Sequence, residues 1–336
     1  MTTPTTDATA GASAERTHYR PRPWLAALLS LLMPGVGHLY AAAPLRGAIA
    51  LTVVLAAFVF FPWLVVAAPP SPITAFLVWA GSLGILVLAA VDAWRVARKS
   101  HAGVRRGWYN HWYVYLASIL VINVAVFAPL RSAIRNHLTQ AFHVPSGAME
   151  PTLLVGDVLF ADKRKSAREP GRGDVIIAES PEDAGLLVVE RAVGISGDTL
   201  AMRAGVLTRN GVTVLEPYLQ IAPPLSKLDT ELLESMRRWQ VEYVPKAERE
   251  KYSPTISDWG PLIVPQDSYF LLGDNRNRSY DSRFYGFVPA TLVRGQPHLI
   301  YWSYDPGNGG RLAWLTRPRF ERFGIGVVAT NRSPTH

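Results

Sequence analysis

The chain has 336 residues, of which 49% are hydrophobic, and it carries a formal net charge of +8. This length accommodates more than one folded unit, and the apolar fraction is high for a protein without a membrane part. The chain contains no cysteine, which excludes disulfides, thiolate metal sites and cysteine nucleophiles. Most basic residues stand in short loops beside apolar runs, as membrane orientation requires, so we predict no nucleic-acid partner.

The N-terminal part has the composition of a membrane region. Residues 1–22 begin with a Thr/Ala-rich stretch without an apolar run, and we predict a disordered cytoplasmic tail there rather than a signal peptide. Within residues 23–130, three stretches approach the roughly 20 apolar residues that cross a bilayer. The predicted spans are 47–68, 73–94 and 111–130.

The segment 24–41 is interrupted by turn-forming residues at 34–37 after a short apolar run. If it crossed the membrane, the basic loop 95–106 would lie outside, against the positive-inside rule. We therefore predict a re-entrant or interfacial segment, which leaves the basic loops cytoplasmic and places the rest of the chain, after the last span, on the extracytoplasmic side of the inner (cytoplasmic) membrane. His38 is either a functional ionisable group or a histidine lying at the surface, and the second interpretation is favoured.

Beyond residue 143 the pattern changes to short alternating runs bounded by Gly, Pro and Asp, which predict strands. A linker is expected at 131–142, followed at 143–330 by a mostly β domain with antiparallel sheets. The predicted strands are 157–163, 173–179, 186–194, 198–203 and 268–274. Asn210–Gly211, between two β-prone runs, predicts a hairpin. The segment at about 222–258 is expected to be a small inserted lobe, which packs on its own domain through Leu225, Leu228, Leu232 and Met236.

Four stretches in fixed order carry the most specific signal. They are PSGAMEPTLLVGDVLFADK (145–163), RGDVIIAE (172–179), VVERAVGISGDTL (188–200) and DWGPLIVPQDSYFLLGDNRNRSYDSRFYGFVPATLVRGQ (258–296). Together they resemble the type I signal peptidases, membrane-anchored serine proteases that remove signal peptides from exported proteins. The resemblance covers about 143–305. It implies transmembrane helices ahead of a signal-peptidase-type β domain, and it implies the signal peptides of exported preproteins and the lipid bilayer as partners.

The resemblance also implies a nucleophilic Ser immediately before the Met of the first motif and a general-base Lys immediately before the Arg of the third. This chain has Ala148 and Glu190 at those positions. A methyl group cannot form an acyl intermediate, and a carboxylate has the opposite charge and a shorter reach than a lysine amine. The resemblance assigns Ser146 to the oxyanion hole and Ser279 to orienting the base. Residues implied to be structural at the site are Met149, Pro151, Gly273, Asp274, Asn275 and the ion pair of Asp281 with Arg283.

The leading hypothesis is a signal peptidase homologue that is impaired or inactive as a peptidase and retains signal-peptide binding, with the origin of the two substitutions, natural or engineered, left open. Two alternatives stay open: an active peptidase with Ser146 as a relocated nucleophile and Glu190 as its base, and a membrane scaffold acting through residues 24–130.

Other chemistries are less well supported by the sequence. A paired-carboxylate protease would use Glu190 with Asp281 or Asp274, but Arg283 is expected to neutralise Asp281, and Asp274 is expected to make turn hydrogen bonds. Lysines at 163 and 165 are expected on a solvated surface. The spacing of the histidines and acids predicts no metal site, and no cofactor motif is present.

Overall fold

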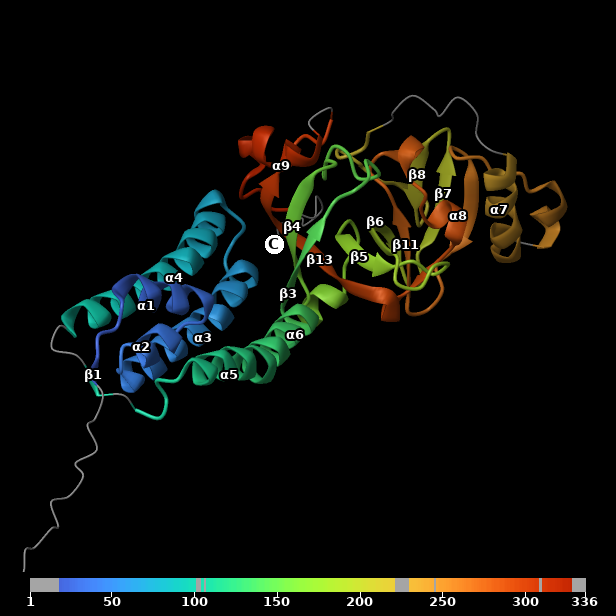
Figure 1. Ribbon diagram of the computed structural model, residues 1–336. Coiled ribbons are helices and arrows are strands. Elements are labelled where there is room, and N and C mark those ends of the chain that lie inside the picture. Colours follow the sequence, from blue (N-terminus) through green and yellow to red (C-terminus); the bar gives the residue numbers. More distant parts are fainter. Residues whose placement is uncertain are drawn as a thin grey trace, which may run out of the picture. The chain divides into compact units, whose positions relative to one another are not determined.

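The computed structural model describes residues 18–100, 104–105, 107–220, 230–244, 246–307 and 310–327 (Figure 1). The chain divides into two compact units, residues 1–59 with 80–130 and residues 60–79 with 131–336. Most of the predicted tail, part of the predicted inserted lobe and the last residues of the predicted β domain lie outside the described residues.

Three helices in the described chain are long and apolar enough to cross a membrane. They are α3 (Pro44–Ala67), α4 (Pro72–Lys99), and α5 (Trp112–Ile122) continued through a π-helical turn at Asn123–Phe127 into α6 (Ala128–His137). The three predicted apolar helices are therefore confirmed. The second and third extend beyond the predicted ends, because basic residues such as Arg95 and Arg131 continue a helix as readily as apolar ones.

Residues 24–41 form two short helices. α1 (Pro23–Leu32) ends before a turn in which Gly35 has a φ of 94°, and α2 (Val36–Tyr40) follows. A Cβ at Gly37 would lie 1.9 Å from the Ala26 carbonyl oxygen, so only glycine allows α1 and α2 to pack this closely. In the same unit, β1 (His18–Tyr19) pairs antiparallel with β2 (Val104–Arg105). The interruption lies where the sequence predicts it, and its depth in a membrane stays a prediction.

The range 131–142 is regular structure instead of the expected linker. α6 continues to His137, and β3 (Thr139–His143) pairs antiparallel with β4 (Asp157–Asp162). The Thr139 hydroxyl also donates to the Ala161 carbonyl oxygen at 2.7 Å. The sequence pattern missed β3 because this strand is held by main-chain pairing with a later strand and not by an apolar run of its own.

The larger sheet has seven strands in the order β12-β11-β6-β5-β13-β4-β3, and each neighbouring pair is antiparallel (Figure 1). Its other strands are β5 (Val175–Glu179), β6 (Leu187–Ile195), β11 (Ser268–Leu272), β12 (Val288–Pro289) and β13 (Val293–Ser303). The predicted strands match β4, β5, β6 and β11. The pattern missed β13, because Gly295 and Pro297 look like strand breakers. The ladder accommodates Pro297 at a register shift before Leu299.

A second, four-stranded sheet has the order β10-β7-β8-β9. Its strands are β7 (Thr199–Arg203), β8 (Val206–Arg209), β9 (Val212–Thr213) and β10 (Trp259–Ile263). Asn210 and Gly211 join β8 to β9 with φ values of 54° and 78°. Two successive positive φ values are the geometry that this dipeptide favours, so the predicted hairpin is confirmed.

The segment predicted to be an inserted lobe contains α7 (Thr230–Gln240) and short helices at Val241–Tyr243 and Lys246–Lys251. Met236 is fully buried in a cluster with Trp259, and Leu232 packs against that cluster. The expected packing of this stripe on its own domain is confirmed for these two residues, whereas Leu225 and Leu228 lie outside the described residues. α7 packs against α8 (Ser282–Tyr285). The other short helices are α9 (Ala313–Thr316) and the turns Lys165–Arg168, Arg276–Arg278, Ala290–Leu292, Gly310–Leu312 and Phe320–Arg322.

Candidate functional site

The loop that contains Ala148 is fixed against the turn after β11. The Asn275 backbone N–H donates to the Ala148 carbonyl oxygen at 2.9 Å, and the Asn275 side-chain amide donates to the Gly147 carbonyl oxygen at 3.1 Å. Met149 is only 2% exposed, and its side chain packs in an apolar cluster with Leu153, which anchors the loop. The Glu150–Pro151 peptide bond that follows is cis. Residue 148 therefore has a defined backbone position although its side chain is only a methyl group.

Gly273 is the point at which three chain segments meet. A Cβ there would lie 2.3 Å from Ser279 Oγ and 2.7 Å from the Ala148 carbonyl oxygen. Neither neighbour is the far end of a flexible side chain, so a side chain at 273 would push the segments apart. The absence of a side chain at Gly273 thus allows Ala148 and Ser279 to lie close together.

Glu190 is buried on β6, with 3% of the residue exposed. The Tyr285 hydroxyl donates to its carboxyl group. Burial, and then the charge of the nearby Asp281 carboxylate, raise the pKa of Glu190 well above the usual value of 4.5, and the polar neighbours Tyr285, Arg283 and Ser279 offset only part of this rise. Glu190 therefore keeps its proton at pH values where an exposed glutamate has lost it.

Ser279 links the two substituted positions. Its hydroxyl lies against Gly273 beside the Ala148 carbonyl oxygen, and it also lowers the pKa of Glu190 slightly. This hydroxyl is buried and makes no hydrogen bond of ordinary geometry to any described residue, so Tyr285 is the stronger partner of the carboxyl group. Ala148, Ser279 and Glu190 are thus brought together.

Asp281 and Arg283 form a fully buried ion pair with a distance of 2.8 Å from Arg283 Nε to Asp281 Oδ1. Asp281 also accepts the Gly273 backbone N–H at 3.1 Å and caps the N-terminus of α8. The structure does bring the carboxyl groups of Glu190 and Asp281 close enough to interact. Asp281 is occupied by Arg283 and by the backbone, however, so this pair lacks the water-activating arrangement of a carboxylate protease.

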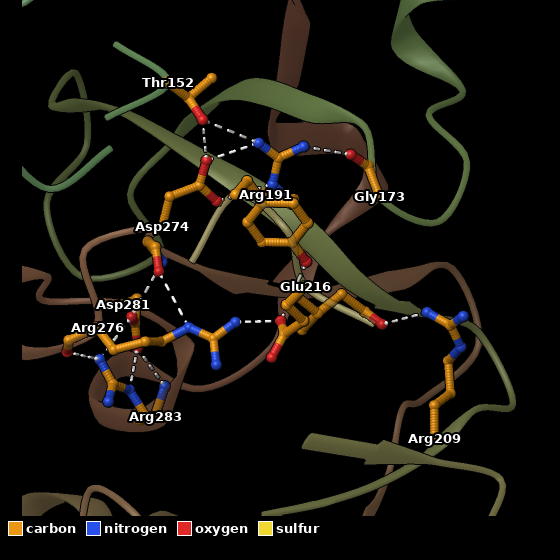
Figure 2. Close-up of polar contacts among 12 residues, drawn as sticks. Thr152, Gly173, Arg191, Arg209, Glu216, Asp274, Arg276, Asp281 and Arg283 are labelled. Atoms are coloured by element: carbon orange, nitrogen blue, oxygen red, sulfur yellow. Dashed lines mark hydrogen bonds and ion pairs between the residues drawn. The ribbon is translucent and has the colours of Figure 1, made fainter. Parts of the chain in front are cut away.

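A second buried ion pair joins Arg191 to Asp274, as Figure 2 shows. Arg191 Nη2 lies 2.6 Å from Asp274 Oδ2, and the Thr152 hydroxyl donates to the same oxygen at 2.5 Å. Arg191 Nη1 donates to the Gly173 carbonyl oxygen at 2.8 Å, and its guanidinium lies 3.8 Å above the Tyr218 ring. The expectation that Asp274 makes turn hydrogen bonds is wrong, because a guanidinium from β6 occupies its carboxylate.

The sequence reasoning missed three of these residues: Arg191, Tyr285 and Glu216, whose carboxylate pairs with Arg276 (Figure 2). A partial signal for Arg191 existed. Neighbouring residues on a strand point to opposite faces of the sheet, so the Arg191 side chain is expected on the face opposite to that of Glu190. Two buried charges on one strand require partners from other segments.

The other candidate residues lie outside this cluster. Ser146 is exposed on the loop before Ala148. Lys163 is 9% exposed, and its amine donates to Gln140 at 2.9 Å, so the expected solvated surface is wrong for this lysine. Burial and nearby arginines lower the pKa of Lys163. Within the described residues, no group of three or more His, Cys, Asp or Glu side chains has a metal-binding arrangement.

Comparisons with known proteins agree on one family. The family model described as "Signal peptidase, peptidase S26" matches residues 112–302. The signal peptidase I of Aquifex aeolicus is 30% identical over 202 residues, which cover 51% of this chain and 78% of that protein. The signal peptidase I of Bacillus licheniformis is 31% identical over 198 residues, which cover 58% and 91%. A crystal structure of a signal peptidase I from Enterococcus faecalis matches 38% of this chain and 96% of that chain, with 31% identity and a TM-score of 0.25. The chain belongs to the signal peptidase family, peptidase S26.

Proposed function

We propose that this protein binds the signal peptides of exported preproteins and does not hydrolyse them. The observation that carries the proposal is the pairing of Ala148 with a buried, proton-retaining Glu190 on an otherwise complete site scaffold. Asn275 and Gly273 hold residue 148 in place, and Ser279 lies between residue 148 and the base position. The supporting contacts are present, and the two reactive groups are replaced.

Each replacement removes one chemical step. Ala148 offers no oxygen to attack a carbonyl carbon, so no acyl intermediate forms. Glu190 retains its proton and accepts a hydrogen bond from Tyr285, so it is a poor proton acceptor for any neighbouring hydroxyl. Loss of the members of such a catalytic unit lowers turnover by about 10⁶ in a well-studied serine protease.

Relocation of the nucleophile to Ser146 is less favourable. Ser146 is exposed, and within the described residues its hydroxyl has no recorded hydrogen bond to a base. Glu190 occupies the position of the base in the family, but its carboxyl group already accepts a hydrogen bond from Tyr285. A displaced nucleophile needs a base atom within about 3 Å of its hydroxyl oxygen, and a small error of position is costly.

The proposal includes an orientation in the inner (cytoplasmic) membrane. The basic segment that ends α4 carries Arg95, Arg98 and Lys99, which favours the cytoplasmic side, and the last apolar helix then leads to an extracytoplasmic β domain. The chain has no native cysteine, so single cysteines introduced at Ser100 and at the exposed Ser253 can be labelled separately in whole cells. An impermeant thiol reagent is expected to label the second and not the first, and the reverse pattern would contradict the orientation.

The test of the proposal is preprotein processing in detergent micelles by four proteins: the chain as given, Ser146→Ala, Ala148→Ser and the Ala148→Ser/Glu190→Lys double variant. We expect no cleavage by the first three and cleavage by the double variant alone. Cleavage by the chain as given that is lost in Ser146→Ala would overturn the proposal in favour of a relocated nucleophile.

A binding measurement completes the test. A fluorescent signal peptide, titrated against the chain as given in the same micelles, should bind, and a peptide of equal length from the mature region should not. Glu190→Lys/Ala148→Ser should bind the same signal peptide with similar affinity before cleaving it. Equal binding of both peptides, or no binding of either, would refute a signal-peptide-binding role.

A further inference from the structure

A polar cluster lies among the helices of the N-terminal unit, away from the site described above. His38 of α2 is fully buried, and its Nε2 lies 3.1 Å from Asp92 Oδ2 on α4. Arg46, near the start of α3, has Nη1 3.8 Å from Asp92 Oδ1. The interpretation of His38 as a surface histidine is therefore wrong, because the close approach of α1 and α2 at Gly37 encloses it.

His38 fixes the Asp92 carboxylate while leaving part of it accessible. The Asp92 side chain is 49% exposed and the Arg46 side chain is 60% exposed. At 3.8 Å the two charges attract each other, but no hydrogen bond between them is recorded. The Arg46 guanidinium and the Asp92 carboxylate thus lie side by side. The N–H groups of Arg46 can donate hydrogen bonds to a ligand, and the exposed part of the Asp92 carboxylate can accept them.

This charge pair stands at one end of an apolar groove of about 450 Å³. The groove is hollow because Ala50 and Ala89 are small, and larger apolar side chains border it; its other lining residues are Ile49, Val53, Val54, Ile85 and Leu88. All of these residues belong to α3 or α4 within the same compact unit. The site therefore combines an apolar slot with a paired positive and negative end.

We infer that this groove binds a zwitterionic glycerophospholipid with a primary ammonium headgroup and no carboxylate, that is, a phosphatidylethanolamine. One acyl chain occupies the slot, the phosphate lies at Arg46 and the ammonium lies at Asp92. Charge complementarity selects this occupant. A glycerol headgroup brings no cation for Asp92, a serine headgroup adds a carboxylate that Asp92 repels, and a choline headgroup brings a cation without N–H donors for the carboxylate. Ionisable groups within apolar transmembrane helices are rare and usually belong to functional sites, which supports a ligand at this charge pair.

Native mass spectrometry of the full chain, delipidated in a mild detergent, tests the inference. The probes are phosphatidylethanolamine, phosphatidylglycerol and phosphatidylcholine with identical acyl chains. The variants are Asp92→Asn and Arg46→Gln. The control is Arg98→Gln, because Arg98 lies over Trp94 on the same helix and does not line the groove.

We expect the chain as given to bind the ethanolamine lipid most tightly, and each of the two groove variants to lose about fivefold in affinity for it, as expected for one charge contact. Arg98→Gln should retain the preference. Equal binding of the three lipids, a preference for the glycerol lipid, or unchanged binding by Asp92→Asn would overturn the inference. If Asp92→Asn does not fold, Ala89→Phe decides: it fills the slot without touching the charges, and unaltered ethanolamine-lipid binding by that variant would equally refute the site.

Discussion

Replacing Glu190 by glutamine tests the central feature of the site, a carboxyl group that keeps its proton. The pKa of Glu190 in the folded protein is raised above the unfolded value of about 4.5. Between these two pKa values the folded protein binds a proton that the unfolded chain does not, so folding is accompanied by proton uptake. The stability contributed by the bound proton is fully present below pH 4.5 and is lost as the pH rises toward the folded pKa. Each pH unit in this window costs about 1.4 kcal/mol of unfolding free energy.

Glutamine binds no proton in either state, so Glu190→Gln removes this loss. Its amide oxygen can accept the Tyr285 hydroxyl, and its uncharged amide avoids the repulsion between an ionised Glu190 and the Asp281 carboxylate. As the pH rises above 4.5, the protein as given should lose stability relative to the variant, so the difference in unfolding free energy between the two should shift in favour of Glu190→Gln.

The assay is denaturant unfolding of the full chain in a non-ionic detergent, followed by tryptophan fluorescence at several pH values. Glu234→Gln, at an exposed position on α7, is the matched control and should follow the pH dependence of the chain as given. Parallel pH curves for the chain as given and Glu190→Gln would show that Glu190 has an ordinary pKa, and the reasoning about the site would then fail.

Three further substitutions probe the scaffold in thermal unfolding experiments. Asp274→Asn leaves Arg191 buried without its partner and should cost about 3–5 kcal/mol; unchanged stability would mean that the pair is not buried. Gly273→Ala forces a Cβ against Ser279 and the Ala148 carbonyl group, so it should lower the unfolding free energy by about 1–3 kcal/mol and weaken signal-peptide binding. Neither effect is expected if the loop that contains Ala148 moves freely. Met236→Ala should cost about 2–5 kcal/mol, and a smaller loss would indicate that α7 is not packed on the domain core.

Several structural features of this protein can be predicted from the sequence alone, because they depend on local residue preferences. Long apolar runs predict the three helices, because backbone groups in lipid must be satisfied within the segment. The hairpin at Asn210–Gly211 follows from the positive φ values that these two residues tolerate. The absence of a nucleophile at Ala148 is also a fact of the sequence, because a methyl group has the same chemistry in any environment.

Other features depend on residues that only the tertiary structure brings together. The sequence identifies Glu190 as an acid, but its retained proton results from burial and from the charge of Asp281 on a distant segment. Arg191 and Asp274 each look like ordinary charged residues until the sheet places them 2.6 Å apart. Burial and pairing are properties of an environment that several chain segments share, and for this reason desolvation and charge partners could not be predicted from local pattern alone.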